Sequence, residues 1–229
     1  RGAVLFGCPF AGKRGICLMK TMTKQEAMAA LKGRCVALIR FDDFETAKAV
    51  AHTVASAGIG ALEVTFTVKD APRLIHELKT EFGETVLVGA GTVLTAEQAK
   101  SARESGADFV TSPCILPEVG AACKQLDMLC SMGAATANEA YQSHLAGSDL
   151  IKLFPGCSIN PEFIRAVQAP LPFLEFMPTD GVDYSNIGSW FENGAYAVGI
   201  GSYLTKGIDL GHLPEAASRS KLLLNAIRG

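Results

Sequence analysis

One lysine interrupts an otherwise apolar segment of the chain. Lys152 lies inside residues 150–153, whereas the other lysines fall in expected helices, loops or the first 20 residues. A buried, unpaired ammonium is costly, so such an amine tends to lose its proton and can then form a Schiff base with a carbonyl. The alternative is a lysine at a strand end whose ammonium reaches solvent or pairs with a carboxylate. Lys152 taken alone leaves both interpretations open.

A carboxylate occupies a second apolar segment. In an extended strand alternate side chains face the same side, so Glu63, Thr65 and Thr67 share one face, opposite the apolar residues of the segment. A carboxylate near a Schiff-base lysine is suited to general acid–base catalysis. The alternative is an ion-pair partner for Arg40 or Lys152 without a chemical role. Both can hold together, because pairing and proton transfer need the same proximity.

Polar residues also end two further apolar segments. Arg40 ends the first of them, and its guanidinium suits a substrate carboxylate or phosphate. The alternative is a solvated arginine bonded to Asp42 or Asp43. Thr92 follows the third segment and places a hydroxyl and backbone N–H groups there. Arg40 and Thr92 are therefore candidates for substrate binding.

The segments that must position these residues alternate regularly along the chain. Short continuous apolar runs are typical of parallel strands buried on both faces. We expect such strands at residues 35–40, 61–66, 86–89, 109–111, 128–130, 150–153, 173–177 and 196–200. Amphipathic helices are expected at residues 44–57, 71–82, 96–105, 118–125, 137–146, 161–167 and 184–192, with their charged residues on solvated faces.

Eight strand–helix repeats predict a (β/α)8 TIM barrel. We expect it as one domain over residues 21–229, with an N-terminal helix at residues 24–32. The alternative is an open, doubly wound sheet, which is disfavoured because no G-x-G-x-x-G motif follows the first strand. In such barrels the reacting groups lie where the strands end, as the candidate residues do.

Two loops after the expected seventh and eighth strands contain glycine, and (β/α)8 barrels often bind phosphate at these loops. Thr179 and Gly181 belong to the first loop, and Gly201 and Ser202 to the second. Backbone N–H groups and hydroxyls there could bind an anion. The carboxylate of Asp180 would repel a phosphate dianion if it faced the same spot.

Composition excludes several classes of protein. The chain has 229 residues, of which 48% are hydrophobic, so it can bury a core and is not a disordered chain. Lys plus Arg number 21 and Asp plus Glu number 23, a net charge of −2 that gives no general attraction to nucleic acid or to an anionic membrane. No run approaches the roughly 18 apolar residues of a membrane span.

Cysteines and histidines predict neither a disulfide framework nor a metal site. The 7 cysteines include no C-x-x-C pair, so we expect reduced thiols in a cytoplasmic protein. The 4 histidines lack metal-ligand spacing, and we expect neither a metal nor another cofactor. Residues 1–20 carry basic residues and no acid. We interpret them as a non-native leader or an extension; the alternative is a targeting peptide.

Eight short motifs occur in one order between about residues 24 and 210. They are ALIR at 37–40, LEVT at 62–65, GAGTVL at 89–94, SP at 112–113, ATANE at 135–139, IKLFP at 151–155, PTDG at 178–181 and GS at 201–202. Together they resemble the 2-keto-3-deoxy-6-phosphogluconate (KDPG) / 4-hydroxy-2-oxoglutarate (KHG) aldolase family. Aldolases of 2-keto-3-deoxy-6-phosphogalactonate are close relatives of that family.

This resemblance implies a class I aldolase in a (β/α)8 barrel, usually a homotrimer, that needs no metal. By position, Lys152 is similar to the Schiff-base lysine of the family and Glu63 to its general acid and base. Thr92 resembles the residue that holds the pyruvyl carboxylate, and Phe154 the aromatic residue that packs on the pyruvyl unit. These four roles are what the resemblance implies for this chain.

The substrate anions are assigned in the same way, with two departures from the family pattern. Many members have arginine where this chain has Thr67; others have a small polar residue there and an arginine at the end of the first strand, like Arg40. We therefore expect both residues to contact the substrate, with Arg40 on its carboxylate or phosphate. The phosphate-loop positions are Thr179, Gly181, Gly201 and Ser202. Asp180 and Ile200 stand where family loops commonly have glycine.

The expected reaction is cleavage of KDPG, or of a related 2-keto-4-hydroxy acid, into pyruvate and an aldehyde, either glyceraldehyde 3-phosphate or glyoxylate. The alternatives are a KHG aldolase and an oxaloacetate decarboxylase that use the same lysine imine. A phosphate-sugar isomerase or synthase barrel without covalent catalysis, or a ligand-binding barrel without activity, is disfavoured. We expect small-molecule ligands, a homotrimer, and no nucleic-acid or membrane partner.

Overall fold

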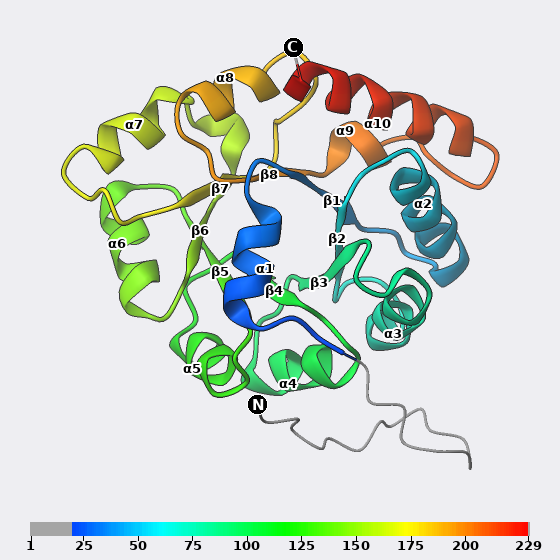
Figure 1. Ribbon diagram of the computed structural model, residues 1–229, viewed down its shortest axis with the longest axis horizontal. Coiled ribbons are helices and arrows are strands. Elements are labelled where there is room, and N and C mark those ends of the chain that lie inside the picture. Colours follow the sequence, from blue (N-terminus) through cyan, green and yellow to red (C-terminus); the bar gives the residue numbers. More distant parts are fainter. Residues whose placement is uncertain (1–19, 229) are drawn as a thin grey trace.

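The computed structural model describes residues 20–228 as eight parallel strands around a central axis, with helices outside them (Figure 1). Hydrogen bonds join the strands in the order β7-β6-β5-β4-β3-β2-β1-β8, so strands adjacent in sequence are neighbours. A bridge between Thr179 and Gly199 links β7 to β8 and brings the barrel close to closure. The (β/α)8 prediction is therefore confirmed, and the open doubly wound sheet is wrong.

The elements follow the predicted alternation. The strands are β1 (Cys35–Ile39), β2 (Ala61–Thr65), β3 (Leu87–Gly91), β4 (Phe109–Ser112), β5 (Leu129–Ala134), β6 (Leu150–Leu153), β7 (Phe176–Pro178) and β8 (Val198–Ile200). The helices are α1 (Lys24–Leu31), α2 (Phe44–Ser56), α3 (Ala71–Phe82), α4 (Ala96–Glu104), α5 (Pro117–Gln125), α6 (Ala137–Leu145), the 3-10 helix η1 (Gly156–Ser158), α7 (Glu162–Gln168), α8 (Ile187–Glu192), α9 (Ser202–Thr205) and α10 (Leu213–Arg228).

Short polar side chains fix where several helices begin. The side chains of Thr23, Asp43, Thr95 and Thr136 accept hydrogen bonds from backbone N–H groups in the first turns of α1, α2, α4 and α6. Each such cap contributes about 1 kcal/mol. Hydrogen bonds from Thr46 lower the pKa of the Asp43 carboxyl, which is therefore occupied in capping α2. The strands themselves are buried at every residue, as continuous apolar runs predict.

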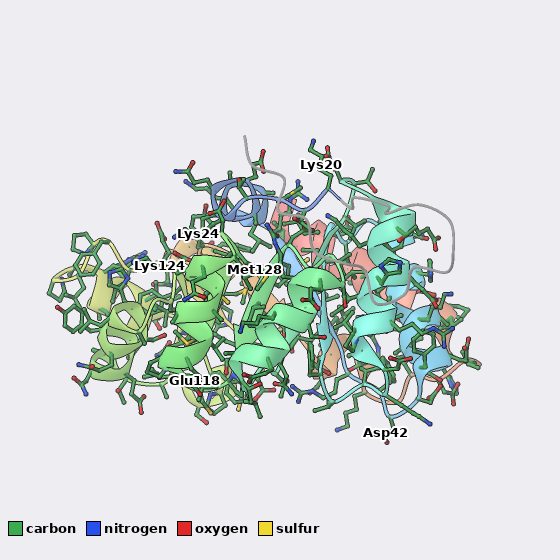
Figure 2. The ribbon with its side chains drawn as sticks, turned by 90° about the horizontal axis from the view of Figure 1, so that it is seen from below. Lys20, Lys24, Asp42, Glu118, Lys124 and Met128 are labelled. Carbon is green, nitrogen blue, oxygen red and sulfur yellow. The ribbon has the colours of Figure 1, made fainter. Side chains whose placement is uncertain are left out.

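Helix α1 crosses the end of the barrel where the strands begin, and in Figure 1 it lies over the barrel centre. Its Ala27 and Leu31 are buried in a cluster with the starts of the strands, at Val36, Ala61, Leu87, Phe109, Leu129, Leu150, Met177 and Ala197. The Tyr196 hydroxyl donates a hydrogen bond of 2.9 Å to the carbonyl of Met28. Figure 2 shows Lys24 at this end and Asp42, which follows β1, at the opposite end. The strand ends are thus left to form the site.

Several boundaries differ from those predicted. The seventh strand begins at Phe176 rather than residue 173, because Phe173 is an exposed residue of a turn, and hydrophobicity alone does not distinguish the two. Likewise β8 begins at Val198 and not at residue 196. The fifth strand continues to Ala134 past Ser131, a polar residue that the barrel buries.

The carboxyl-terminal helix was not predicted. Helix α10 follows the last strand and packs beside α2, with Ala216 and Leu223 fully buried. The strand–helix repeat is complete at the eighth strand, so the repeat itself indicates no helix after residue 200. Of the expected leader, only Lys20 is described. Within residues 20–228 no helix is long and apolar enough to cross a membrane.

Candidate active site

A small cavity lies at the end of the barrel where the strands end. It encloses about 110 Å³, well below the roughly 300–1,000 Å³ of sites for drug-sized ligands, which suits a small metabolite. Residues from β1, β3, β4, β6, β7 and β8, or from the loops after them, contribute to its wall. They are Leu38, Arg40, Thr92, Pro113, Lys152, Phe154, Thr179, Asp180, Gly201 and Ser202, with Thr205 of α9.

Lys152 connects this cavity to a buried carboxylate. Its side chain is 4% exposed, and Nζ lies 3.2 Å from Oε1 of Glu63, which is fully buried. Nζ also lies 3.3 Å from the hydroxyl of Thr111, on β4. Lys152 lines the cavity, whereas Glu63 lies outside its wall. A proton can therefore pass between the amine and a group that solvent does not reach.

The second oxygen of this carboxylate has no protein partner. Oε2 of Glu63 is buried without a hydrogen bond in the described part of the chain. The absence of a side chain at Gly91 makes room for Glu63, because a Cβ there would overlap its carboxylate. A buried acceptor left unpaired costs about 1–3 kcal/mol, and such exceptions need an explanation. Here the free acceptor belongs to the carboxylate that pairs with Lys152, a lysine that faces the cavity.

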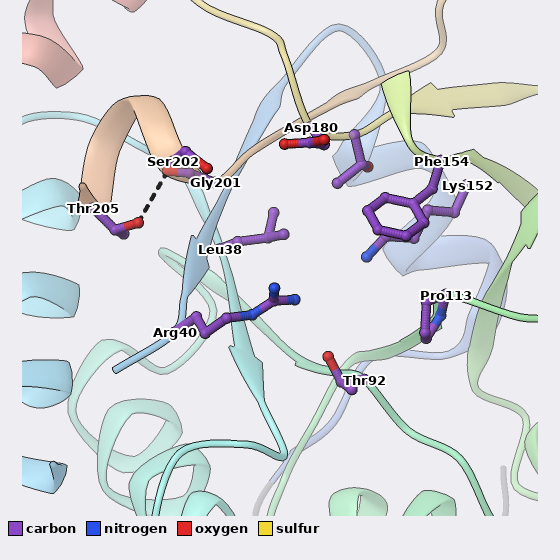
Figure 3. A pocket seen from close by; sticks show the side chains of 11 residues that line it. Leu38, Arg40, Thr92, Pro113, Lys152, Phe154, Asp180, Gly201, Ser202 and Thr205 are labelled. Atoms are coloured by element: carbon purple, nitrogen blue, oxygen red, sulfur yellow. Dashed lines mark hydrogen bonds between the residues drawn. The ribbon is translucent and has the colours of Figure 1, made fainter. Parts of the chain in front are cut away.

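Two charged groups of opposite sign line the cavity on opposite sides. Figure 3 shows Arg40 reaching toward the cavity from the side of Thr92, Asp180 on the opposite side, and Lys152 between them. Within residues 20–228 neither Arg40 nor Asp180 forms a salt bridge. The alternative of a solvated arginine is thus met in part: Arg40 is exposed, but no salt bridge joins it to Asp42 or Asp43 within residues 20–228. The cavity offers a free cation at one side and a free carboxylate at the other.

Two residues of the wall have an unusual backbone conformation. Thr92 has φ +55° and Asp180 has φ +76°, in the left-handed region that residues other than glycine seldom adopt. Such conformations concentrate at functional sites, where the surrounding structure over-determines them. Asparagine and aspartate tolerate this region better than most residues. The aspartate at position 180 therefore fits the backbone that the loop requires.

The structure brings most of the predicted site residues together. Those that line the cavity are Lys152, Arg40, Thr92, Phe154, Thr179, Gly201 and Ser202. Thr67 does not line it: the residue is exposed beyond the end of β2, and its hydroxyl lies 2.7 Å from that of Thr65. Gly181 is also outside the wall and has φ +72°, where a Cβ would overlap Cys157. Gly181 is thus needed for the shape of the turn.

Four residues at the site escaped the sequence analysis as candidates. Leu38 and Pro113 stood in motifs without a role, and Thr205 belongs to α9, a helix too short to predict. The sequence did contain a signal for Thr111, because it is a polar residue inside an apolar strand, as Glu63 is. Polar residues within apolar strands are therefore the most informative positions of this sequence.

Other chemistry-bearing residues do not gather at the site. Among residues 20–228 no group of three or more His, Cys, Asp or Glu side chains could hold a metal ion. The described cysteines are free; Cys114 and Cys157 are exposed, whereas burial raises the pKa of the Cys35 thiol to about 11. The site thus consists of the amine, the carboxylates, the guanidinium and hydroxyl groups around one cavity.

Sequence comparison defines the class of protein. The family model described as KDPG and KHG aldolase matches residues 27–212 of the chain. The chain therefore belongs to the KDPG and KHG aldolase family, a family of lyases.

Individual relatives agree with this assignment. The chain is 31% identical over 189 residues to the 2-dehydro-3-deoxy-6-phosphogalactonate aldolase of Escherichia coli (strain K12), covering 81% of this chain and 87% of that protein. It is 32% identical over 187 residues to the 2-dehydro-3-deoxy-phosphogluconate aldolase of Haemophilus influenzae, covering 74% and 86%. A solved structure described as native KDPGal superimposes with a TM-score of 0.77 at 27% identity, covering 85% and 94%.

Proposed function

We propose that this chain is a class I aldolase that cleaves a 2-keto-4-hydroxy acid into pyruvate and an aldehyde. The observation that supports the proposal is the position of Lys152: its amine lines the cavity and lies 3.2 Å from the buried carboxylate of Glu63. A lysine held in this way can pass a proton to its neighbour and then act as a nucleophile. KDPG and KHG are both 2-keto-4-hydroxy acids.

The first half of the reaction builds the imine. Glu63 takes a proton from Nζ of Lys152, and the neutral amine attacks the C2 ketone of the substrate. The resulting carbinolamine loses its hydroxyl group as water, with the proton for that step returned by Glu63. The product is a protonated imine, which accepts electrons from the adjacent C3–C4 bond.

The second half breaks the carbon–carbon bond. The C4 hydroxyl loses its proton to Glu63 through a water molecule, because Glu63 lies outside the cavity wall. The electron pair of the C3–C4 bond moves into the imine, which releases the aldehyde and leaves the enamine of pyruvate on Lys152. Protonation at C3 and hydrolysis of the imine then yield pyruvate and the free amine. The sum is one 2-keto-4-hydroxy acid to one pyruvate and one aldehyde.

The wall of the cavity orients the substrate for these steps. The carboxylate next to C2 is placed at Arg40 and Thr92, since a guanidinium binds a carboxylate in a planar, charge-assisted way. Phe154 packs on the pyruvyl unit. The remaining part of the substrate then extends toward Thr179 and Ser202, which also line the cavity. Figure 3 shows Ser202 on the side of the cavity away from Thr92.

Borohydride reduction in the presence of pyruvate tests the proposal. An imine at Lys152 becomes a stable carboxyethyl-lysine, and peptide mass spectrometry is expected to place that group on Lys152. Lys79 serves as an internal control, because it is equally buried and paired but does not line the cavity. Absence of the group from Lys152, or its presence on Lys79 at a comparable level, would refute the imine mechanism.

Oxaloacetate decarboxylation would use the same imine, with carbon dioxide as the leaving group. Trapping with pyruvate does not separate the two reactions, whereas the rates with oxaloacetate, KHG and KDPG do. We propose aldol cleavage as the main reaction, because the family to which the chain belongs is one of aldolases.

The homotrimer and the cytoplasmic location stay predictions. A surface that could pack against another copy lies at the end of α6, where Leu145 is 61% exposed and the ring of His144 lies 5.2 Å from that of the exposed Phe173. Light scattering of the purified protein is expected to give three times the mass of one chain.

A further inference from the structure

Among residues 20–228, the side of the cavity opposite Thr92 carries the carboxylate of Asp180 and no cationic side chain; we call it the distal side. Asp180 lines the cavity on the side opposite Thr92, and Arg40 and Lys152 are the cationic side chains of the wall. The mechanism occupies both cations: Lys152 binds C2, and Arg40 holds the neighbouring carboxylate. The aldehyde half of the substrate therefore meets a carboxylate, with the hydroxyl of Ser202 also in the wall.

The backbone around Asp180 is packed, so the point from which this carboxylate extends into the wall has a defined place. The N–H of Gly156 donates a hydrogen bond of 2.8 Å to the carbonyl of Thr179. A Cβ at Gly156 would overlap the carbonyl oxygen of Asp180, which shows how closely the two loops approach. The left-handed φ of +76° at Asp180 is compatible with this packing. Asp180 is held at the wall by its main chain, independently of any side-chain partner.

A carboxylate in this place selects between two kinds of substrate. An ionised carboxylate accepts hydrogen bonds and donates none, so it binds hydroxyl groups well. It repels a phosphate dianion or a second carboxylate, and the repulsion is stronger in a partly closed cavity than in bulk water. An anionic end would therefore be disfavoured, whereas a polyol end would gain a charge-assisted hydrogen bond.

We propose that the preferred substrate ends in uncharged hydroxyl groups, as an unphosphorylated 2-keto-3-deoxy sugar acid does, and that Asp180 determines this preference. Cleavage of such an acid yields pyruvate and an uncharged hydroxyaldehyde such as glyceraldehyde. The inference rests on the proposed aldolase function and narrows its substrate class. It separates this chain from the Escherichia coli and Haemophilus influenzae relatives described above, whose names specify phosphorylated sugar acids.

The test compares kcat/KM for 2-keto-3-deoxygluconate and for its 6-phosphate. The wild-type protein is expected to favour the unphosphorylated acid by about tenfold or more, and Asp180→Asn is expected to move this ratio toward the phosphate by about tenfold. Asp127→Asn is the matched control, because Asp127 also has a left-handed φ, of +46°, and precedes β5 at the other end of the barrel. The control is expected to leave the ratio unchanged.

Two results would overturn the inference: a wild-type preference for the phosphorylated acid, or an unchanged ratio in the variant. Asp180→Gly provides a second variant if Asp180→Asn does not fold, because glycine adopts positive φ readily. Trapping of pyruvate on wild-type Lys152 separates this inference from the proposed function, since pyruvate lacks the distal half. Failed trapping refutes the aldolase mechanism, whereas successful trapping with the wrong substrate preference refutes only the role of Asp180.

Discussion

Two lysine–carboxylate pairs are buried in this barrel, and they differ in how fully their atoms are paired. In the first pair, Nζ of Lys152 contacts one oxygen of Glu63 at 3.2 Å. In the second, Nζ of Lys79 contacts both oxygens of Asp108, at 2.8 and 2.7 Å. The exposed fractions are nearly the same, 4% and 0% for the first pair and 2% and 0% for the second. Burial alone therefore does not distinguish them.

The remaining hydrogen bonds separate the two pairs. Each oxygen of Asp108 also accepts a backbone N–H at 3.1 Å, one from Met22 before α1 and the other from Val88 of β3. No oxygen of Asp108 is left for chemistry, and the pair fastens the N-terminal segment to the barrel. Glu63, by contrast, retains an unpaired oxygen, and its lysine faces the cavity. This incomplete set of hydrogen bonds next to a cavity supports the proposed chemical role of the first pair.

The largest effect is expected from removing the amine of the first pair. Lys152→Met keeps a side chain of similar length but cannot form an imine. Turnover of a 2-keto-4-hydroxy acid is expected to fall by more than about 10³-fold, as for loss of a covalent nucleophile. Steady-state assays measure the loss, and circular dichroism verifies the fold. A variant that keeps near-normal turnover would remove the chemical distinction between the two pairs.

Removing the charge of Glu63 is expected to have the next largest effect. Glu63→Gln preserves the shape of the side chain but cannot take a proton, so kcat is expected to fall by about 10²–10⁴-fold. The rate at which borohydride traps pyruvate is expected to fall as well. Asp108→Asn, the corresponding change in the second pair, is the comparison. If kcat per folded molecule falls equally in both variants, the proton-transfer role of Glu63 is wrong.

The second pair is expected to act on stability and not on chemistry. Lys79→Met leaves the carboxylate of Asp108 buried without its cation, and the free energy of unfolding is expected to fall by about 3–5 kcal/mol. Lys48→Met breaks the partly exposed pair with Glu77 and is expected to cost less than about 1 kcal/mol. Urea denaturation measures both. A normal stability for Lys79→Met would show that the pair does not hold the barrel end.

The smallest expected effect is a difference in labelling rate between cysteine thiols at the two ends of the barrel. Cys35 begins β1 at the end covered by α1, and burial raises its pKa to about 11, so it carries little thiolate at pH 8. Cys114 follows β4 at the cavity end and is exposed. A maleimide at pH 8 is expected to label Cys114 well before Cys35, with peptide mass spectrometry as the readout. Raising the pH toward 11 should increase thiolate at Cys35, whereas labelling at equal rates at pH 8 would contradict a sealed end.

The difference between the two pairs also explains what the sequence could predict. Lys152 and Glu63 were recognisable because each is a charged residue within an apolar strand. Lys79 was not recognisable, because charged residues are common in an amphipathic helix and one more among them gives no signal. The expectation that Lys79 lies on a solvated helix face is wrong, because it is buried against Asp108. Asp108 precedes β4, and only the closure of the barrel brings α3 next to it.

Loop positions were predictable only in part. Thr92 and Ser202 were found because they follow apolar strands, and both line the cavity. Gly181 and Thr67 also follow strands but lie outside the wall. The direction in which a residue after a strand faces depends on the dihedral angles of the loop, which the sequence pattern does not give. The orientation of Asp180 depends on its left-handed φ and on packing against Gly156, which no local pattern indicates.

The position of α1 has a consequence for the kinetics of the enzyme. Because this helix covers the strand starts, reactants are expected to exchange at the opposite end, where the cavity lies. In the proposed mechanism the pyruvyl unit is bound to Lys152 while the aldehyde is not bound covalently. In the cleavage direction the aldehyde is therefore expected to depart before pyruvate. In the synthetic direction pyruvate has to enter before its partner, so product inhibition is expected to show an ordered pattern in which pyruvate competes with the keto acid.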